Sequence, residues 1–235
     1  VSLLGVVALL GSLALVPSNL PKPAPASLSS QLAVLAQPRL LLVYAMTALG
    51  YGGSFTAFTF LAPMLETVSG FAPGAVALIM LLYGVSVAIG NIWGGRLADR
   101  KGPVAALKII FAGLALVLLA LTFTAGSKWL VALTVLAWGA VAFGNVAGLQ
   151  LYVVSQARAR VPQAVDVASG LNIAAFNVGI AGGAWLGGHV VASLGLMATP
   201  WIGALIVLGA WLLTAWSGRL DAGHASGMTV AAGRI

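Results

Sequence analysis

The chain has 235 residues, of which 61% are hydrophobic and 6% charged, and its mean hydropathy is +1.08. Such a composition cannot cover a globular fold with polar groups, which excludes a water-soluble domain and indicates an integral membrane protein. The net charge of +7 is spread one loop at a time, which argues against nucleic-acid binding, and the lack of cysteine excludes disulfides and thiolate sites.

The amino-terminal segment is apolar but short for a membrane span, because a crossing helix needs about 20 residues. We interpret residues 1–16 as the end of a truncated transmembrane helix. A signal peptide is the alternative, although the run lacks a basic leader. Four prolines, together with Ser27, Ser29 and Ser30, follow between positions 17 and 30. They predict that residues 17–38 form a cytoplasmic linker.

Six later segments are long and apolar enough to cross a hydrocarbon core of about 30 Å. They are Leu40–Leu65, Gly74–Gly95, Val104–Ala125, Trp129–Val154, Ala168–Leu194 and Thr199–Ser217. They predict an all-α, polytopic membrane protein with a six-helix bundle over residues 39–218. Of the 11 basic residues, only Lys128 falls in the second set of alternating loops. The positive-inside rule therefore places both ends of the bundle, and a tail at 219–235, in the cytoplasm.

Polar and aromatic side chains recur within the predicted first and fourth spans. Tyr51 lies near mid-depth of the first, and Asn145 lies between two aromatic residues on one face of the fourth. An amide between aromatic rings suits a ring-bearing or polyhydroxylated solute, whereas packing aromatics with a satisfied interhelical amide are the alternative. The candidate solute-lining residues are Tyr51, Ser54, Phe55, Tyr83, Trp138, Asn145, Tyr152 and Asn177.

A charged stretch joins the second and third spans. Gly90 and Gly94 form a Gly-x-x-x-Gly pair that predicts close approach to a neighbouring helix. Gly102 followed by Pro103 predicts the end of one helix and the start of the next. An ordinary positively charged turn is the alternative reading. The candidate conformational residues are Gly90, Gly94, Gly95, Asp99, Arg100 and Gly102.

This stretch resembles the signature loop of the major facilitator superfamily, Gly-x-Leu-Ala-Asp-Arg-x-Gly followed by two basic residues. The match holds up to Gly102, but Pro103 and Val104 replace the basic pair. The resemblance implies that Asp99 and Arg100 latch the cytoplasmic side when the central cavity opens outward. The missing basic pair implies a weaker latch.

The resemblance covers nearly the whole chain, because the loop lies between the second and third of six helices. It implies the carboxyl-terminal half of a transporter, helices 7 to 12, preceded by the end of helix 6. The amino-terminal half is the alternative, since the family carries a related loop there. The preceding helix end and the altered signature favour the carboxyl-terminal half.

The fifth span carries glycines at four-residue spacing, Gly179, Gly183 and Gly187, which predict close helix packing. Asn177 lies on a second face of small residues, so this helix is expected to pack on two sides. The stretch 168–190 resembles the eleventh helix of drug and sugar efflux permeases of the proton-antiport branch, particularly the arabinose-efflux-like members. That resemblance implies export of a small organic solute driven by inward proton movement.

The third and sixth spans are almost wholly aliphatic at mid-depth, so they are expected to face lipid. The acidic residues Glu66, Asp99, Asp166 and Asp221 all lie at predicted membrane edges, and none is a mid-membrane proton carrier. If the protein is a proton antiporter, we expect the titrating carboxylate in a missing amino-terminal half.

The sequence favours a transporter of the inner (plasma) membrane over an enzyme, because it has no His-Glu-x-x-His or Gly-x-Ser-x-Gly motif. No cofactor or metal is expected. The expected partners are a small-molecule solute, protons, the lipid bilayer and the missing six-helix half. The alternative is a complete six-helix protein that acts as a homo-oligomeric transporter, a channel or a scaffold.

Overall fold

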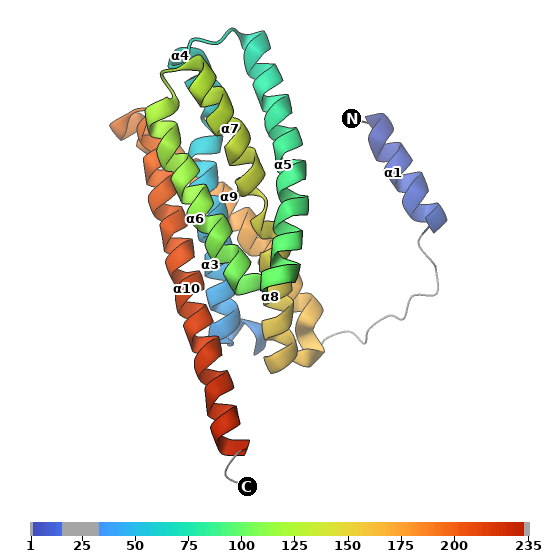
Figure 1. Cartoon of the computed structure of the whole chain (residues 1–235). Helices are drawn as coiled ribbons and strands as arrows, with labels where there is room; N and C mark the ends of the chain where they lie inside the picture. The colour runs from blue at the N-terminus through green and yellow to red at the C-terminus, as the bar shows by residue number, and fades with distance from the viewer. Residues whose placement is uncertain (1, 16–32, 233–235) are drawn as a thin grey trace.

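The computed structural model describes residues 2–15 and 33–232, and every regular element within them is helical. A short helix, α1 (Ser2–Leu15), lies apart from the others (Figure 1). The bundle consists of α3 (Pro38–Phe58), α4 (Leu61–Thr67), α5 (Pro73–Lys101), α6 (Pro103–Thr124), α7 (Lys128–Ala142), α8 (Asn145–Arg160), α9 (Val165–Leu194) and α10 (Ala198–Ala232). A 3₁₀ turn at Pro162–Ala164 precedes α9. Most of the predicted linker, residues 17–32, lies outside the described residues.

The described chain contains six spans that are long and apolar enough to cross a membrane. Two of them are pairs of helices, α3 with α4 and α7 with α8, and the others are α5, α6, α9 and α10. The prediction of an all-α, six-span membrane protein is therefore confirmed.

Two spans predicted as continuous helices are interrupted. The first breaks at Thr59 and Phe60, because Pro63 has no N–H and its ring would clash with the carbonyl of Thr59 in an unbroken helix. The fourth breaks at Phe143 and Gly144, where no proline is present. Sharp bends without proline commonly occur at glycine.

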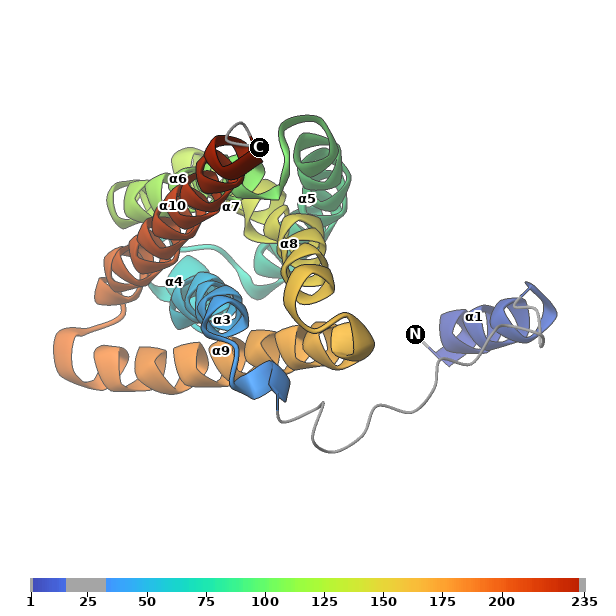
Figure 2. The same cartoon turned by 90° about the horizontal axis from the view of Figure 1, so that it is seen from below.

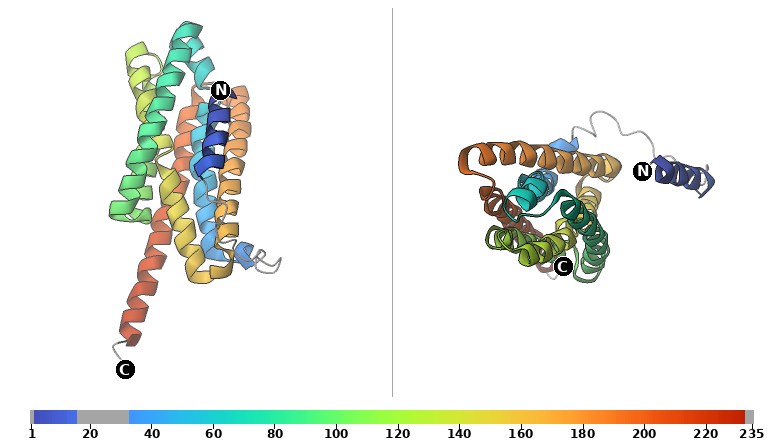
Figure 3. Two further views of the ribbon diagram at one scale, coloured as in Figure 1. Left: turned by 90° about the vertical axis from the view of Figure 1, so that its right-hand side faces the viewer. Right: turned by 90° about the horizontal axis from the view of Figure 1, so that it is seen from above.

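The second predicted span is longer than its apolar run. The prediction ended the helix at Gly95 and placed a charged loop after it, but α5 continues to Lys101. No helix-breaking residue lies between these positions, and basic side chains at a helix carboxyl end interact favourably with its dipole. The last helix likewise continues beyond its predicted end at Ser217, through the segment predicted as a tail, to Ala232 (Figure 3).

Helix α3 lies inside the bundle, with α9 on one side and α10 on another (Figure 2). A Cβ added at Gly183 would overlap the carbonyl of Gly52, and one added at Gly53 would lie 2.5 Å from the carbonyl oxygen of Gly203. Gly179 and Gly187 face α3 in the same way. Glycine at these positions therefore lets α3 approach both neighbours at backbone distance.

Burial differs strongly among the spans. The most apolar window of α3 is 67% buried, those of α6 and α10 are 44% buried, and those of α5 and α9 are only 22% buried. The windows of α6 and α10, the third and sixth spans that the sequence predicts to face lipid, are also less than half buried. The small residues of α5 and α9 pack on one face, whereas the opposite faces have no neighbour within the described chain.

We predict that Gly183→Ala destabilises the bundle by about 1–3 kcal/mol, because the new methyl group would overlap backbone that cannot move aside. Thermal unfolding of the purified protein in detergent measures this effect. The adjacent substitution Gly182→Ala is the matched control, because its Cβ would meet no atom within 4 Å. Equal melting temperatures for the two variants would contradict the proposed α3–α9 contact.

Candidate functional site

A cavity of about 370 Å³ lies between α3, α5, α8 and α9, beside the break in the fourth span. Its volume is within the range of about 300–1,000 Å³ found for small-molecule sites. Among the candidate lining residues chosen from the sequence, Tyr51 is the one that lines it. The full lining is Thr47, Tyr51, Asn91, Phe143, Val146, Leu149, Gln150, Asn172, Ile173 and Phe176.

Tyr51 is joined to a second candidate residue behind the cavity wall. Its hydroxyl donates a hydrogen bond of 2.8 Å to Oδ1 of Asn145, the first residue of α8. Asn145 is fully buried, and its Nδ2 has no hydrogen-bond partner among the described residues. A buried donor without an acceptor costs free energy. The Asn145 Nδ2 group can therefore donate a hydrogen bond to a water molecule or to a solute.

A chain of hydrogen bonds crosses the same wall between three helices. Thr47 Oγ1 donates to Asn172 Oδ1 at 2.7 Å, and Asn172 Nδ2 donates to Gln150 Oε1 at 3.4 Å. Gln150 Nε2 in turn donates to Ser169. Sequence reasoning did not select Gln150, although an amide at this depth of a span is itself a signal of a buried partner or a cavity.

Aromatic rings supply the apolar part of the cavity. Phe143 and Phe176 pack edge-on against Tyr51, with centroid distances of 5.8 and 4.1 Å. The arrangement leaves rings beside the hydroxyl and amide groups of the wall. It suits a solute with both a hydrophobic face and hydrogen-bonding groups.

Four candidate residues form a separate aromatic cluster, roughly one helical turn farther along α3. Tyr83 and Trp138 both pack against Phe58, at 5.0 and 5.9 Å, and Trp138 Nε1 donates to Ser54 Oγ at 3.0 Å. Phe55 also packs against Phe58, at a centroid distance of 5.3 Å. None of these side chains lines the 370 Å³ cavity.

The remaining two candidates lie away from the cavity. Tyr152 is buried in the middle of α8, where its hydroxyl lies 2.6 Å from Ser217 Oγ. Asn177 is exposed on α9 and donates to the carbonyl of Ile173, one turn back on its own helix, at 2.9 Å. The structure thus brings Tyr51 and Asn145 together and separates Tyr152 and Asn177 from them.

The cavity wall contains hydroxyl, amide and aromatic groups but no charged side chain. Amides both donate and accept hydrogen bonds, so they can bind a hydroxyl group that acts as a donor or as an acceptor. Within the described chain, no three His, Asp or Glu residues form a group that could hold a metal ion. The chemistry of the wall therefore fits a neutral polar solute better than an ion.

The helix break lies directly at this cavity. Phe143, which with Gly144 forms the break between α7 and α8, is part of the cavity wall. The carbonyl of Gly144 lies against Gly94 of α5, so a Cβ at position 94 would overlap it. Non-helical backbone at membrane depth is tolerated where protein or a water-filled cavity surrounds it.

The charged segment of α5 contributes contacts at two levels. Gly90 lies against the backbone of Ala140 in α7, one turn before the contact of Gly94 with Gly144, whereas a Cβ at Gly95 would only touch the Ala147 side chain at 3.8 Å. Gly90 and Gly94 therefore hold α5 against the broken fourth span.

Gly102 alone connects α5 to α6, and its φ of 78° is a conformation that favours glycine. Asp99 and Arg100 are exposed in the last turn of α5. Neither forms an ion pair with any residue in the described part of the chain.

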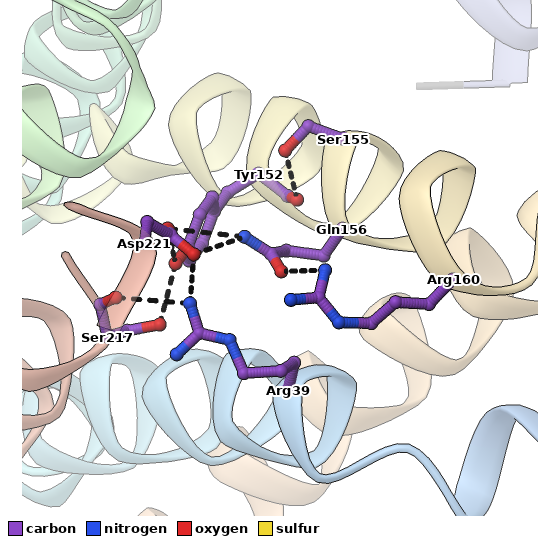
Figure 4. Close-up of polar contacts among 7 residues, drawn as sticks. All are labelled: Arg39, Tyr152, Ser155, Gln156, Arg160, Ser217 and Asp221. Atoms are coloured by element: carbon purple, nitrogen blue, oxygen red, sulfur yellow. Dashed lines mark hydrogen bonds and ion pairs between the residues drawn. The ribbon is translucent and has the colours of Figure 1, made fainter. Parts of the chain in front are cut away.

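A partly buried charged group lies at the end of the bundle that carries most basic residues, and we call this end of the bundle the basic end. Arg39, at the start of α3, pairs through Nη2 with Asp221 of α10 and also donates to the carbonyl of Ser217 at 3.1 Å (Figure 4). The Arg39 side chain is 12% exposed and that of Asp221 is 34% exposed. Nε and Nη1 of Arg39 have no partner among the described residues.

Three side chains of α8 complete the charged group around Asp221. The Tyr152 hydroxyl donates to Asp221 Oδ2 at 2.7 Å, and Gln156 Nε2 donates to the two carboxylate oxygens at 3.2 and 3.3 Å. Gln156 Oε1 accepts from Arg160 at 2.6 Å (Figure 4). Sequence reasoning assigned Asp221 to a tail and missed the ion pair, which joins residues 182 positions apart.

Comparison with known proteins gives one family. The sequence profile of the Major Facilitator Superfamily matches residues 1–165. The Bacillus subtilis (strain 168) protein called "Uncharacterized MFS-type transporter YtbD" is 50% identical over 217 residues, which are 92% of this chain and 54% of that protein.

More distant relatives carry functional names. "Inner membrane transport protein YdhP" of Escherichia coli (strain K12) is 37% identical over 190 residues, 80% of this chain and 48% of that protein. The "Probable sugar efflux transporter" of Helicobacter acinonychis (strain Sheeba) is 31% identical over 212 residues, 88% of this chain and 52% of that protein. The chain thus spans about half the length of the curated relatives it matches.

We predict that Asp221→Asn lowers the free energy of unfolding by about 1–3 kcal/mol, because Arg39 would remain largely buried without its counter-charge. The value is below that of a fully buried pair, since Asp221 is partly exposed. Thermal unfolding in detergent measures it. Glu66→Gln, which neutralises an exposed acid at the opposite end, is the control.

The double variant Arg39→Gln with Asp221→Asn should lose less stability than the sum of the two single variants. Strict additivity would contradict an energetic role for the ion pair.

Proposed function

Because this chain belongs to the major facilitator superfamily, we propose that it is the carboxyl-terminal half of a secondary active transporter that exports a small organic solute. Its membership and its six apolar spans make it a multi-pass membrane protein. The proposed solute is a neutral molecule such as a sugar or an uncharged drug, moved by alternating access. The sugar efflux name of one relative is in line with this class.

The observation that carries the proposal is the uncharged polar and aromatic cavity. Gln150 and Asn172 offer amides to a polyhydroxylated or ring-bearing solute, and Tyr51 adds a ring beside them. The buried Nδ2 of Asn145 supplies a further donor behind Tyr51. We assign the solute path to this wall.

The exposed faces of α5 and α9 support a partner half. Asn91 of α5 lines the cavity and is exposed, and Gly84 on the same helix has no atom near its Cβ position. On α9, Asn177 and Ala181 are exposed one turn apart. We assign these small, partly polar faces to contact with an amino-terminal six-helix half, because small residues allow close helix approach.

The same assembly gives the charged end of α5 a partner. Asp99 and Arg100 have no ion pair within the described chain, so they are free to contact the other half. We propose that this contact latches the basic end of the bundle when the solute path opens on the opposite side. The excess of basic residues at this end supports its placement in the cytoplasm.

We further propose proton antiport with the proton carrier in the other half. Glu66, Asp99 and Asp166 are exposed near helix ends, and Asp221 is held by Arg39. No acidic side chain lines the cavity described above. A titrating carboxylate that alternates between the two sides of the membrane would therefore have to come from outside this half.

Gln150→Ala and Asn172→Ala should each lower solute export by about tenfold, because each removes hydrogen-bonding groups from the wall. The measurement is the rate at which arabinose, or an uncharged drug such as chloramphenicol, collapses a preformed pH gradient in inside-out vesicles that contain the assembled transporter. Thr134→Ala is the control, because that hydroxyl only bonds its own helix at Leu130.

Full activity in both cavity variants, with normal membrane levels, would contradict the assigned path. Failure of the unaltered protein to respond to either solute would contradict the sugar or drug class. A tail antibody that detects the native polypeptide near 23.7 kDa, rather than about twice that mass, would contradict the partner half and favour a homo-oligomer.

A further inference from the structure

Two cavities follow the seam between α6 and α10, away from the proposed solute path. The first, of about 790 Å³, lies at the basic end and extends to the end of α8. The second, of about 380 Å³, lies farther along the same two helices. Trp211 belongs to both walls, so the two cavities are neighbours. We call them the basic cavity and the apolar groove.

The basic cavity has the chemistry of an anion site. Lys101, Lys108 and Arg219 belong to its wall, and all three are exposed. None of them forms an ion pair or hydrogen bond with the described residues. The carboxylate of Asp221 is also in the wall, but Arg39 compensates its charge. The wall therefore carries three basic groups whose charge no neighbouring acid cancels.

The start of α6 adds to the positive potential. Gly102 and Pro103 belong to the wall, and the first turn of this helix has no side-chain cap. Uncapped backbone amides at a helix amino end favour an anion. This feature reinforces the three basic side chains rather than forming a site by itself.

The apolar groove has almost no polar surface. Ala112, Ala115 and Ala204 form its floor, between larger side chains that stand out to either side. The flanking side chains are Leu116, Leu119, Trp201, Leu205, Leu208 and Trp211. Lys108 lies one turn from Ala112 on α6, so the basic groups and the groove follow one helix face.

We propose that this seam binds an anionic phospholipid, with its phosphate in the basic cavity and one acyl chain in the apolar groove. Basic pockets between transmembrane helices at the cytoplasmic side suit anionic lipid head groups. The long side chain of Lys108 can extend its ammonium group from within α6 to the head-group level. A soluble phosphate would use the basic groups alone and would leave the adjoining groove unexplained.

The site differs from the proposed solute path in position and chemistry. Its wall shares no residue with the uncharged cavity. Tyr152 and Gln156, which bind Asp221, form part of the basic cavity. A bound lipid would thus contact the group that ties α3, α8 and α10 together, and the proposal does not depend on transport.

Native mass spectrometry of the detergent-purified protein tests this site, with phosphatidylglycerol and phosphatidylcholine of the same acyl chains as probes. Phosphatidylglycerol should bind more tightly. The double variant Lys108→Gln with Arg219→Gln should weaken that binding roughly 25-fold, at about fivefold for each basic side chain, and should leave phosphatidylcholine unchanged. Both side chains are exposed, so the variant should unfold at the same temperature as the original protein.

Arg96→Gln is the matched control, because Arg96 is exposed at the same end but lies outside the cavity. An equal loss in this variant would mean general attraction to a basic surface and would overturn the site. Ala112→Phe should fill the groove and weaken phosphatidylglycerol binding without a change of charge. Equal affinity for both lipids, or displacement of the lipid by inorganic phosphate, would also overturn the proposal.

Discussion

Backbone contact on both sides of α3 is the constraint on which the other features depend. Helices in a bilayer gain little from hydrophobic burial against one another, so close packing and shared polar contacts must hold them. Glycines let α3 approach α9 at Gly52 and Gly183, and α10 at Gly53 and Gly203. The position of α3 then fixes Tyr51 at the uncharged cavity, near the middle of the first span. It also places Arg39, at the start of the same helix, beside Asp221 of α10.

The arrangement separates two kinds of polar chemistry along the membrane axis. Uncharged amides and hydroxyls gather at mid-depth, where an isolated charge would be expensive. The ion pair lies at the basic end of the bundle, where Asp221 is still partly exposed to water. The aromatic cluster around Trp138 occupies the next level beyond the uncharged cavity. Each level thus contains the groups that its local dielectric tolerates, and the helices are joined by different interactions at different depths.

Hydropathy was sufficient to find the six spans, because their apolar runs are long and the connections between them are short. The break at Pro63 was readable from the sequence, but the break at Gly144 was not, since glycine is common inside these helices. The sequence predicted Asn145 and Tyr152 as lining residues of the same span, but it gave no depth for Tyr152, which lies two turns farther on. Its partner Asp221 belongs to another helix, and the register between separate helices depends on packing that hydropathy does not contain.

The one-residue connection at Gly102 has a mechanical consequence. Two successive Cα steps of about 3.8 Å bring the ends of α5 and α6 within roughly 7 Å of each other, so the pair forms a stiff hairpin with almost no slack. Torque applied to α5, one of the two least enclosed helices, is passed directly to α6. Because α6 also borders the basic cavity and the apolar groove, any tilt of α5 would move one wall of both cavities.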